Sequence, residues 1–297
     1  MAVLIRSGEP SPADFMAEIS IRPITDAEFA LFQALIYREA GIYLSEAKKA
    51  LLVGRLTKRL KALGLTTFKE YYGRVVDEND EAERVRLFDS ICTNETHFFR
   101  EPHQFAFLEN HIIPEFSAQA AAGLRPRRIR VWSAACSTGE EPYSIAMVLM
   151  HHLPPSSGWG IEVLATDLST RALRVAEGGV WPLEKRSEIP IRYLKSSMLR
   201  DTRSQEGRMK ASPEVQAVIQ FYRINLNHAS YSVAGSFDLI FCRNVLIYFD
   251  ADSRARVVSR LLNQLEPGGY FFVGHAESLN GVTDLVRNVV PTVYAFR

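Results

Sequence analysis

Two adjacent carboxylates, Glu140 and Glu141, stand where the sequence otherwise indicates a nucleotide-binding turn. Residues 129–147 (IRVWSAACSTGEEPYSIAM) read as a buried strand, a turn of small residues and a helix opened by Pro142. A phosphate-binding turn favours glycines and often a lysine, because the ligand is anionic and the helix N-terminus is already positive. Acids at this position instead favour a nucleoside that has no phosphate and carries a cationic end.

Polar residues also follow the neighbouring predicted strands. Asp167 ends the second strand, Asn225 the third, and Arg243 with Asn244 the fourth, so all should meet at one edge of a parallel sheet. An acid after the second strand commonly accepts hydrogen bonds from ribose hydroxyls, although Asp167 could instead cap the following helix. The absence of a G-x-G-x-x-G motif disfavours a dinucleotide. S-adenosylmethionine, which has hydroxyls and a cationic amino-acid tail, fits better.

The elements that would position these residues change in character near residue 94. Apolar residues recur at helical spacing up to that point, which predicts a flexible N-terminus over residues 1–20 and a small all-α domain over residues 21–94. Residues 95–127 read as a mostly helical linker. Over residues 128–297, short apolar runs alternate with helices, which is typical of an α/β domain with a parallel sheet. The runs are IRVWSA, IEVLATD, VIQFYRIN, FDLIFCRN, GGYFFVG and TVYAFR.

Composition limits the classes of function. The chain has 297 residues, of which 47% are hydrophobic and 23% charged, and no apolar run approaches the roughly 20 residues that span a bilayer. The apolar segment at the N-terminus is too short for a signal peptide, and the three cysteines form no C-x-x-C pair. We therefore expect a cytoplasmic protein with no structural metal and no membrane insertion. A net charge of +1 also argues against nucleic acid as a partner.

Five motifs together resemble the CheR family of chemotaxis receptor methyltransferases. They are TNETHFFRE (93–101), SAACSTGEEPYSIA (133–146), ATDLSTRAL (165–173), FDLIFCRNVLIYF (237–249) and GHAES (274–278). The resemblance implies a Rossmann-like methyltransferase domain with an inserted small antiparallel β-subdomain, preceded by a helical domain. It also implies transfer of the S-adenosylmethionine methyl group to glutamate side chains in the cytoplasmic domain of chemoreceptors. The products would be glutamyl methyl esters and S-adenosylhomocysteine.

The resemblance also assigns residues to the site. Glu141 would meet the ligand's ammonium and Asp167 its ribose. The alternative for Glu140 is that its negative charge simply interacts favourably with the positive N-terminus of the helix. Arg100 and Tyr248 would lie near the transferring methyl group; the alternatives are an Arg100 ion pair with Glu101 and a half-buried aromatic ring at position 248. The full set of implied cofactor contacts is Asn94, Thr96, Arg100, Glu141, Asp167, Asn225, Leu226, Arg243 and Asn244.

A basic stretch offers a surface for the receptor. Residues 47–63 contain six lysines and arginines and no acid. We predict that Lys48, Arg55, Lys58 and Arg59 form a docking surface, since the family's receptor helices are acidic around the methylated glutamates. An ordinary solvated helix face is the alternative.

The predicted β-subdomain, residues 190–222, suggests a second receptor contact. Some family members bind the receptor's C-terminal peptide there by strand addition. Here Asp201 and Arg203 stand where glycines are expected, which leaves Gly207 to permit a positive φ. We predict weak or altered peptide binding, and the alternative is none.

Two other functions compete with receptor methylation. A noncatalytic module that binds S-adenosylmethionine would keep Asp167 but has no need of Arg100 or Tyr248, and both are present. A nucleic-acid methyltransferase is disfavoured because the strand end reads CRNVLIYF in place of an NPPY-like motif. The sequence therefore favours a protein-glutamate O-methyltransferase.

Overall fold

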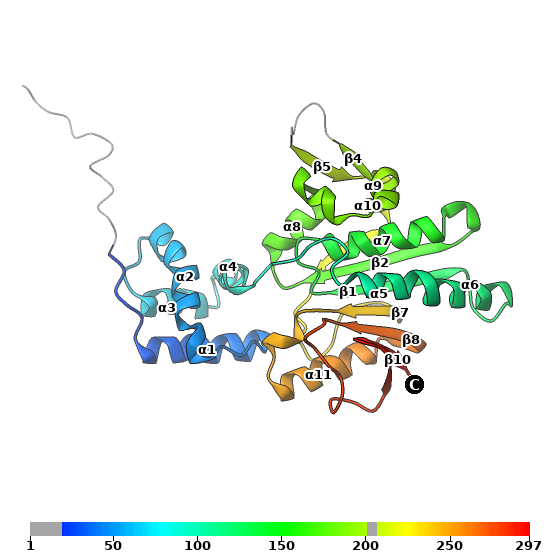
Figure 1. Ribbon diagram of the computed structural model, residues 1–297. Helices are drawn as coiled ribbons and strands as arrows, with labels where there is room; N and C mark the ends of the chain where they lie inside the picture. The colour runs from blue at the N-terminus through cyan, green and yellow to red at the C-terminus, as the bar shows by residue number, and fades with distance from the viewer. Residues whose placement is uncertain (1–19, 201–206) are drawn as a thin grey trace, which may run out of the picture. The chain divides into compact units, whose positions relative to one another are not determined.

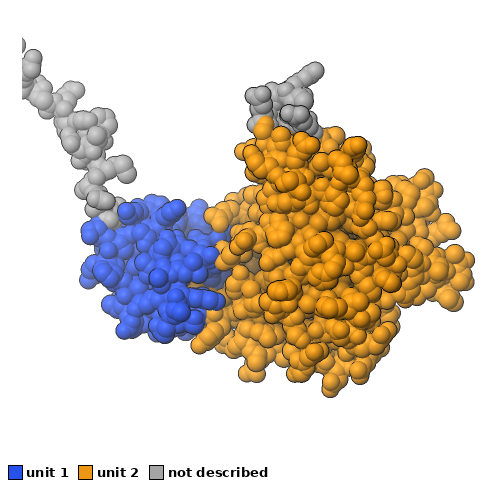
Figure 2. Space-filling view, in the orientation of Figure 1, with its two compact units in different colours: residues 1–35, 44–91 blue, residues 36–43, 92–297 orange. Residues whose placement is uncertain are grey.

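Four α-helices bury the apolar positions of residues 26–91 in the computed structural model, which describes residues 20–200 and 207–297. The described chain forms two units, coloured in Figure 2: residues up to 35 with 44–91, and residues 36–43 with 92–297. The core of the first unit includes Phe32, Leu56 and Tyr71. Its helices are the first part of α1 (Asp26–Ala40), whose residues from 36 onward belong to the second unit, and α2 (Lys49–Leu63), α3 (Phe68–Val76) and α4 (Glu81–Ile91).

Local signals explain where these helices begin and end. Gly64 ends α2 at a φ of +70°, a conformation that glycine adopts without strain. Thr67 begins α3 with a capping box, because its side chain accepts a hydrogen bond from the Glu70 backbone N–H at 3.2 Å. The Glu70 carboxylate in turn accepts one from the Thr67 backbone N–H at 2.9 Å.

One buried ion pair joins α2 to α4. The fully buried Glu83 carboxylate accepts hydrogen bonds from both arms of the Arg59 guanidinium, the Nε one at 2.7 Å. Burial alone would raise the pKa of Glu83, but hydrogen bonds from Arg59 and the positive charge of its guanidinium more than offset it and hold the pKa below its usual value. The ionised carboxylate is therefore part of the helical core.

The second unit is built on a seven-stranded sheet within the described residues. Five neighbouring strands are parallel, and the last two at one edge are added by antiparallel pairing, which agrees with the predicted α/β fold class. In spatial order the strands are β6 (Ile219–Arg223), β2 (Gly160–Asp167), β1 (Arg128–Ala134), β7 (Phe237–Cys242), β8 (Leu265–Val273), β10 (Val293–Phe296) and β9 (Val286–Val290).

Alternating side chains on β1 divide the core between the two faces of this sheet. Ile129 and Val131 pack with α7 (Glu140–His152), whereas Trp132 and Ala134 pack with α11 (Ala251–Leu262). Figure 1 shows these two helices on opposite sides of the sheet. The remaining helices are α5 (Pro102–Phe107), a π-helical turn (Leu108–Ile112), α6 (Ile113–Ala121), α8 (Thr170–Gly178), α9 (Ile191–Ser197) and α10 (Pro213–Ala217).

A second, three-stranded antiparallel sheet matches the predicted inserted subdomain in kind. Its order is β3 (Val180–Pro182), β5 (Arg208–Ala211) and β4 (Met198–Arg200). It takes its first strand from before the predicted range 190–222, while residues 219–223 at the end of that range form β6 of the main sheet. The short β3 has only three residues, too few to show an alternating pattern in the sequence.

The sequence did not predict β9 either, because so short a strand has no clear alternation of apolar and polar residues. This five-residue edge strand carries exposed Arg287 and Asn288 at its centre. Within the described residues, no helix is both long and apolar enough to cross a bilayer.

We expect Arg59→Ala to lower the free energy of unfolding of the helical unit by about 3 kcal/mol, because it leaves the buried Glu83 carboxylate without its principal partner. Denaturant unfolding measures the change. The exposed neighbour Lys58 supplies the control: Lys58→Ala should change stability by less than about 0.5 kcal/mol.

The deficit should also depend on pH. A lowered pKa means that the contribution of Glu83 is present above the unfolded pKa and is lost as the pH falls through the folded one. The gap between wild type and Arg59→Ala should therefore narrow in acid, and a gap that stays constant would contradict the assignment.

Candidate functional site

The turn after β1 brings the first two strand ends together through strained backbone. Ala135 and Ser137 have φ values of +70° and +52°, which non-glycine residues adopt at a cost and which cluster at functional sites. The Cys136 backbone N–H donates to the Thr166 carbonyl at 2.8 Å, and that of Ser137 donates to the Asp167 carboxylate at 2.8 Å. The turn is therefore held against the end of β2.

Asp167 organises this edge and is not the cap of α8. One carboxylate oxygen accepts the Ser137 N–H and the other accepts the Ser169 N–H at 2.8 Å. The cap itself is Ser169, whose hydroxyl accepts the Ala172 N–H at 3.2 Å. The capping alternative for Asp167 is thus excluded, and its side chain lies at the carboxyl end of β2, 8% exposed.

The two glutamates that open α7 face different partners. Glu140 is buried, and its carboxylate accepts a hydrogen bond from the Thr138 hydroxyl at 2.7 Å and forms an ion pair with Lys185 at 2.6 Å. Lys185 also donates to the Thr96 carbonyl at 2.9 Å. Glu140 therefore does more than favour the helix N-terminus: with Lys185 it holds the segment of Thr96 in place.

Glu141 points toward β7, where Arg243 lies between two acids. The Arg243 guanidinium contacts the Glu141 carboxylate at 2.9 Å and the Glu101 carboxylate at 3.3 Å, and it also donates to the Arg100 carbonyl. Ser133 donates to Glu141 at 2.7 Å. Because the Arg243 side chain is 1% exposed, this acid–guanidinium–acid cluster is an interior charge network.

Glu101 is a member of this cluster that the sequence treated only as an alternative partner of Arg100. Burial would raise the pKa of Glu101, but Arg243 and the His275 backbone N–H hold it below its usual value. Its backbone lies at a φ of +61°. Within residues 20–200 and 207–297, the one hydrogen bond of the Arg100 side chain is a long 3.4 Å contact with the Glu95 carbonyl.

Residues 36–43, at the end of α1, belong to the same unit and hold two of the predicted site segments. Asn225 donates to the Glu39 carbonyl at 2.7 Å, and the Tyr43 N–H donates to the Tyr248 carbonyl at 2.9 Å. Gly41 has a φ of +69°, and a Cβ there would lie 2.9 Å from the Asn227 side-chain oxygen, so another residue would be strained and would displace Asn227. Sequence reasoning missed this role because these residues read as part of the helical domain.

The other predicted contacts are placed as follows. Asn94 lies 3.5 Å from the Ser169 hydroxyl, Leu226 is a buried residue of the loop after β6, and Asn244 follows β7 at a φ of +58°. Tyr248 is half-buried. Asp167 and Arg243 thus lie at the carboxyl ends of β2 and β7. Asn94 is linked to Asp167 through Ser169, Thr96 to Glu140 through Lys185, and Glu141 directly to Arg243.

In the helical unit, the predicted docking residues differ in accessibility. Arg59 is engaged by Glu83, and Arg55 donates to the Ile91 carbonyl. Lys58 is exposed, and Lys48 is partly so. The acid-free run is therefore not a uniform solvated face. Two of its arginines contact residues of α4, which lies outside the run.

Two further predictions concern the small sheet and metals. Asp201 and Arg203 lie outside the described residues, while Gly207 has a φ of +86°, as expected. Among the described residues, no three His, Cys, Asp or Glu side chains are grouped so that they could hold a metal ion.

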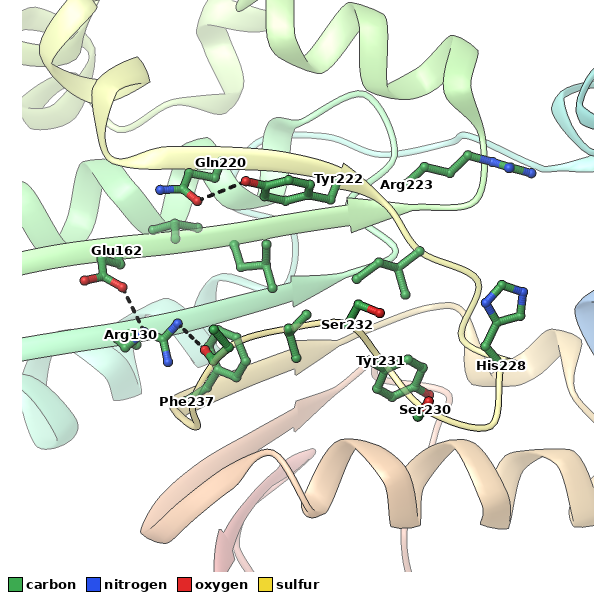
Figure 3. A pocket seen from close by; sticks show the side chains of 15 residues that line it. Arg130, Glu162, Gln220, Tyr222, Arg223, His228, Ser230, Tyr231, Ser232 and Phe237 are labelled. Atoms are coloured by element: carbon green, nitrogen blue, oxygen red, sulfur yellow. Dashed lines mark hydrogen bonds and ion pairs between the residues drawn. The ribbon is translucent and has the colours of Figure 1, made fainter.

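A hollow of about 470 Å³ lies on the face of the sheet beside β6, β2 and β1 (Figure 3). The loop after β6 closes one side with Tyr231, and Tyr222 and Glu162 project from the strands. None of the predicted cofactor residues lines it. The hollow is thus distinct from the edge where Asp167 and Arg243 meet.

That edge fits a ligand with hydroxyls and a charged end. In the part of the chain that the structure describes, the Ser137 hydroxyl and the Arg243 Nε are buried without a hydrogen-bond partner. Buried polar atoms without partners are costly, so they indicate where a polar ligand would be favourable. Ser137 lies beside Asp167 and Arg243 beside Glu141, which places these atoms next to the residues that the motifs assign to S-adenosylmethionine.

Comparisons with known proteins cover nearly the whole chain. The family model described as "CheR methyltransferase, all-alpha domain" matches residues 27–92, and that described as "CheR methyltransferase, SAM binding domain" matches residues 94–295. Both agree with the resemblance carried by the sequence motifs.

Named relatives are similar over the same span. The chain is 38% identical over 275 residues to chemotaxis protein methyltransferase 2 of Pseudomonas aeruginosa, covering 91% of this chain and 93% of that one. It is 37% identical over 273 residues to the chemotaxis protein methyltransferase of Escherichia coli, covering 92% and 91%. With that of Borreliella burgdorferi the identity is 34% over 272 residues, covering 91% and 94%.

Proposed function

Because the chain belongs to the CheR methyltransferase family and is therefore an S-adenosylmethionine-dependent methyltransferase, we propose that it methylates glutamate side chains of chemoreceptor cytoplasmic domains. The observation that carries the proposal is the edge itself. Asp167 ends β2 and the cluster of Arg243 with Glu141 and Glu101 follows β7, at the same edge of the sheet, in a chain that matches chemotaxis methyltransferases over nine-tenths of its length.

The reaction asks for positioning more than for proton transfer. The bound S-adenosylmethionine supplies a sulfonium methyl group, whose S–C bond breaks as a C–O bond to the substrate forms, giving a glutamyl methyl ester and S-adenosylhomocysteine. A substrate glutamate with an unperturbed pKa of about 4.3 is already ionised at neutral pH, so no general base is needed. The rate then depends on proximity and alignment of the incoming carboxylate.

Arg100 and Tyr248 are the residues that we assign to this alignment. The Arg100 backbone is fixed by Arg243, while its guanidinium makes only a weak contact and can turn to an incoming carboxylate. The Tyr248 carbonyl accepts the Tyr43 backbone N–H, which fixes the Tyr248 backbone, and we assign to its half-buried phenol the orientation of the same carboxylate. The ion pair of Glu101 is formed with Arg243, which supports a substrate-facing role for Arg100.

Cofactor recognition is assigned to the residues around them. We assign Asp167 and the Ser137 hydroxyl to the ribose and Glu141 to the ammonium. The Glu141 carboxylate would then pair with the ligand's ammonium and the Arg243 guanidinium at the same time. Asn94, Thr96, Asn225, Leu226 and Asn244 complete the proposed contacts. The side chain of Asn225 already bonds Glu39 and Asn227, so its contribution would come from its backbone.

The function is tested by incubation with tritiated S-adenosylmethionine and receptor cytoplasmic fragments. We expect label on the receptor that is released as methanol by mild base, as methyl esters are. Base-stable label, or label on DNA alone, would refute the proposal, and binding without transfer would point to a noncatalytic module. Fragments that lack the C-terminal pentapeptide test the small sheet: a weak peptide site predicts a rate at most a few-fold lower.

Asp167→Ala should weaken S-adenosylhomocysteine binding at least tenfold, a loss of about 1.4 kcal/mol, because the carboxylate both faces the ligand and holds the Ser137 turn. Calorimetry on the folded variant measures this. Asp238 gives a matched control, since it accepts the Arg130 N–H at 2.7 Å at the opposite end of β7. Unchanged affinity in Asp167→Ala, or an equal loss in Asp238→Ala, would refute the assignment.

Docking of the acidic receptor helices is assigned to the accessible part of the basic stretch, Lys58 with Lys48, and less to Arg55 and Arg59. Lys58→Glu should slow receptor methylation at least threefold at low salt and leave S-adenosylhomocysteine affinity unchanged. The difference should shrink with added salt, which screens exposed charges. Lys69→Glu, an exposed lysine on α3, is the control. Equal rates for both variants would mean that the stretch is merely solvated.

A further inference from the structure

Glu277 is a buried acid that the proposed chemistry does not use. It lies in the GHAES motif after β8 and is 7% exposed. One carboxylate oxygen accepts the backbone N–H groups of Gly274 at 2.6 Å and Asn244 at 2.8 Å, and the other accepts that of Ile247 at 3.2 Å. A single side chain thus ties the loop after β8 to the loop after β7.

Burying the Glu277 carboxylate costs free energy, so its presence at this position needs an explanation. Burial raises the pKa of Glu277, although the backbone N–H groups of Gly274, Asn244 and Ile247 oppose the shift. An apolar side chain of similar size would avoid the cost of burying a carboxylate. What the acid supplies is acceptors for peptide groups that face into the protein at the end of a strand.

The loop that Glu277 holds carries residues of the proposed site. Arg243 and Asn244 begin it and Tyr248 ends it. Asn244 lies in the left-handed region at a φ of +58°, a strained conformation that its fixed N–H helps to maintain. Gly274 packs closely against it: a Cβ there would lie 2.4 Å from the Asn244 side-chain nitrogen, 2.8 Å from the Asn244 backbone nitrogen and 2.8 Å from the Glu277 carboxylate.

We propose that Glu277 is a positioning residue for methyl transfer, which acts by fixing the backbone of residues 244–247 and so the placement of Arg243, Asn244 and Tyr248. The inference rests on the proposed function for its catalytic readout. It assigns Glu277 no contact with cofactor or substrate. Its effect is to keep the loop in one conformation before either arrives.

The test compares Glu277→Ala and Glu277→Gln with Asp238→Asn in the full chain. Asp238 also accepts a backbone N–H, pairs with Arg125, and lies at the far end of β7. We expect Glu277→Ala to lower kcat at saturating S-adenosylmethionine at least tenfold and to weaken S-adenosylhomocysteine binding at least tenfold. Glu277→Gln should lie between it and wild type, because its amide oxygen can still serve Gly274 and Asn244 but its NH2 group opposes Ile247.

Amide hydrogen exchange separates this role from general stability and from the function itself. The Asn244 and Ile247 amides should both lose protection in Glu277→Ala, the Ile247 amide alone should lose it in Glu277→Gln, and both should keep it in Asp238→Asn, whose kcat should stay within twofold of wild type. Glu277→Gln carries the test if Glu277→Ala does not fold. Retained protection, or kcat and affinity within twofold of wild type, would overturn the proposal. If wild type transfers no methyl group, the proposed function fails while exchange and affinity still decide the role of Glu277.

Discussion

The buried guanidinium of Arg243 is the contact on which the arrangement of the site depends. It joins the start of α7 through Glu141, the segment before α5 through Glu101 and the Arg100 carbonyl, and the end of β7 from which it projects. A charge so deeply buried is tolerated only when its partners are in place. Three segments that are distant in sequence are therefore fixed to one another by a requirement of electrostatics.

Much of this edge could be predicted from the sequence, and the reason is topological. Parallel strands bring their carboxyl ends to one edge, so Asp167 and Arg243 could be placed there from the strand pattern alone. The partner of each charge could not. Two neighbouring glutamates look alike in the sequence, yet Glu140 meets Lys185 and Glu141 meets Arg243. Which partner each one meets depends on the direction of its side chain in the first turn of a helix.

The basic stretch shows a related limit. Counting charges within residues 47–63 predicts a free face, because no acid lies inside that window. The acid that binds Arg59 is Glu83, which lies in an acidic run of its own on α4. Patterns within a window describe helix faces well, but they do not reveal that a charge is neutralised by another helix. For the same reason, Glu277 could not be recognised as the acceptor for the loop after β7, since its partners are backbone groups.

The end of α1 blurs the boundary between the two family segments. The matches change from one to the other near residue 93, yet residues 36–43 pack with the catalytic unit and bond the segments of Asn225 and Tyr248. A fragment cut at the family boundary would lack them. Exchanging the N-terminal segment between relatives would likewise replace the residues that contact Asn225 and Tyr248 with those of another protein. The geometry of the loops that carry Asn225 and Tyr248 is in this sense inherited together with the N-terminal segment, because residues 36–43 lie in that segment of the sequence yet pack in the methyltransferase unit.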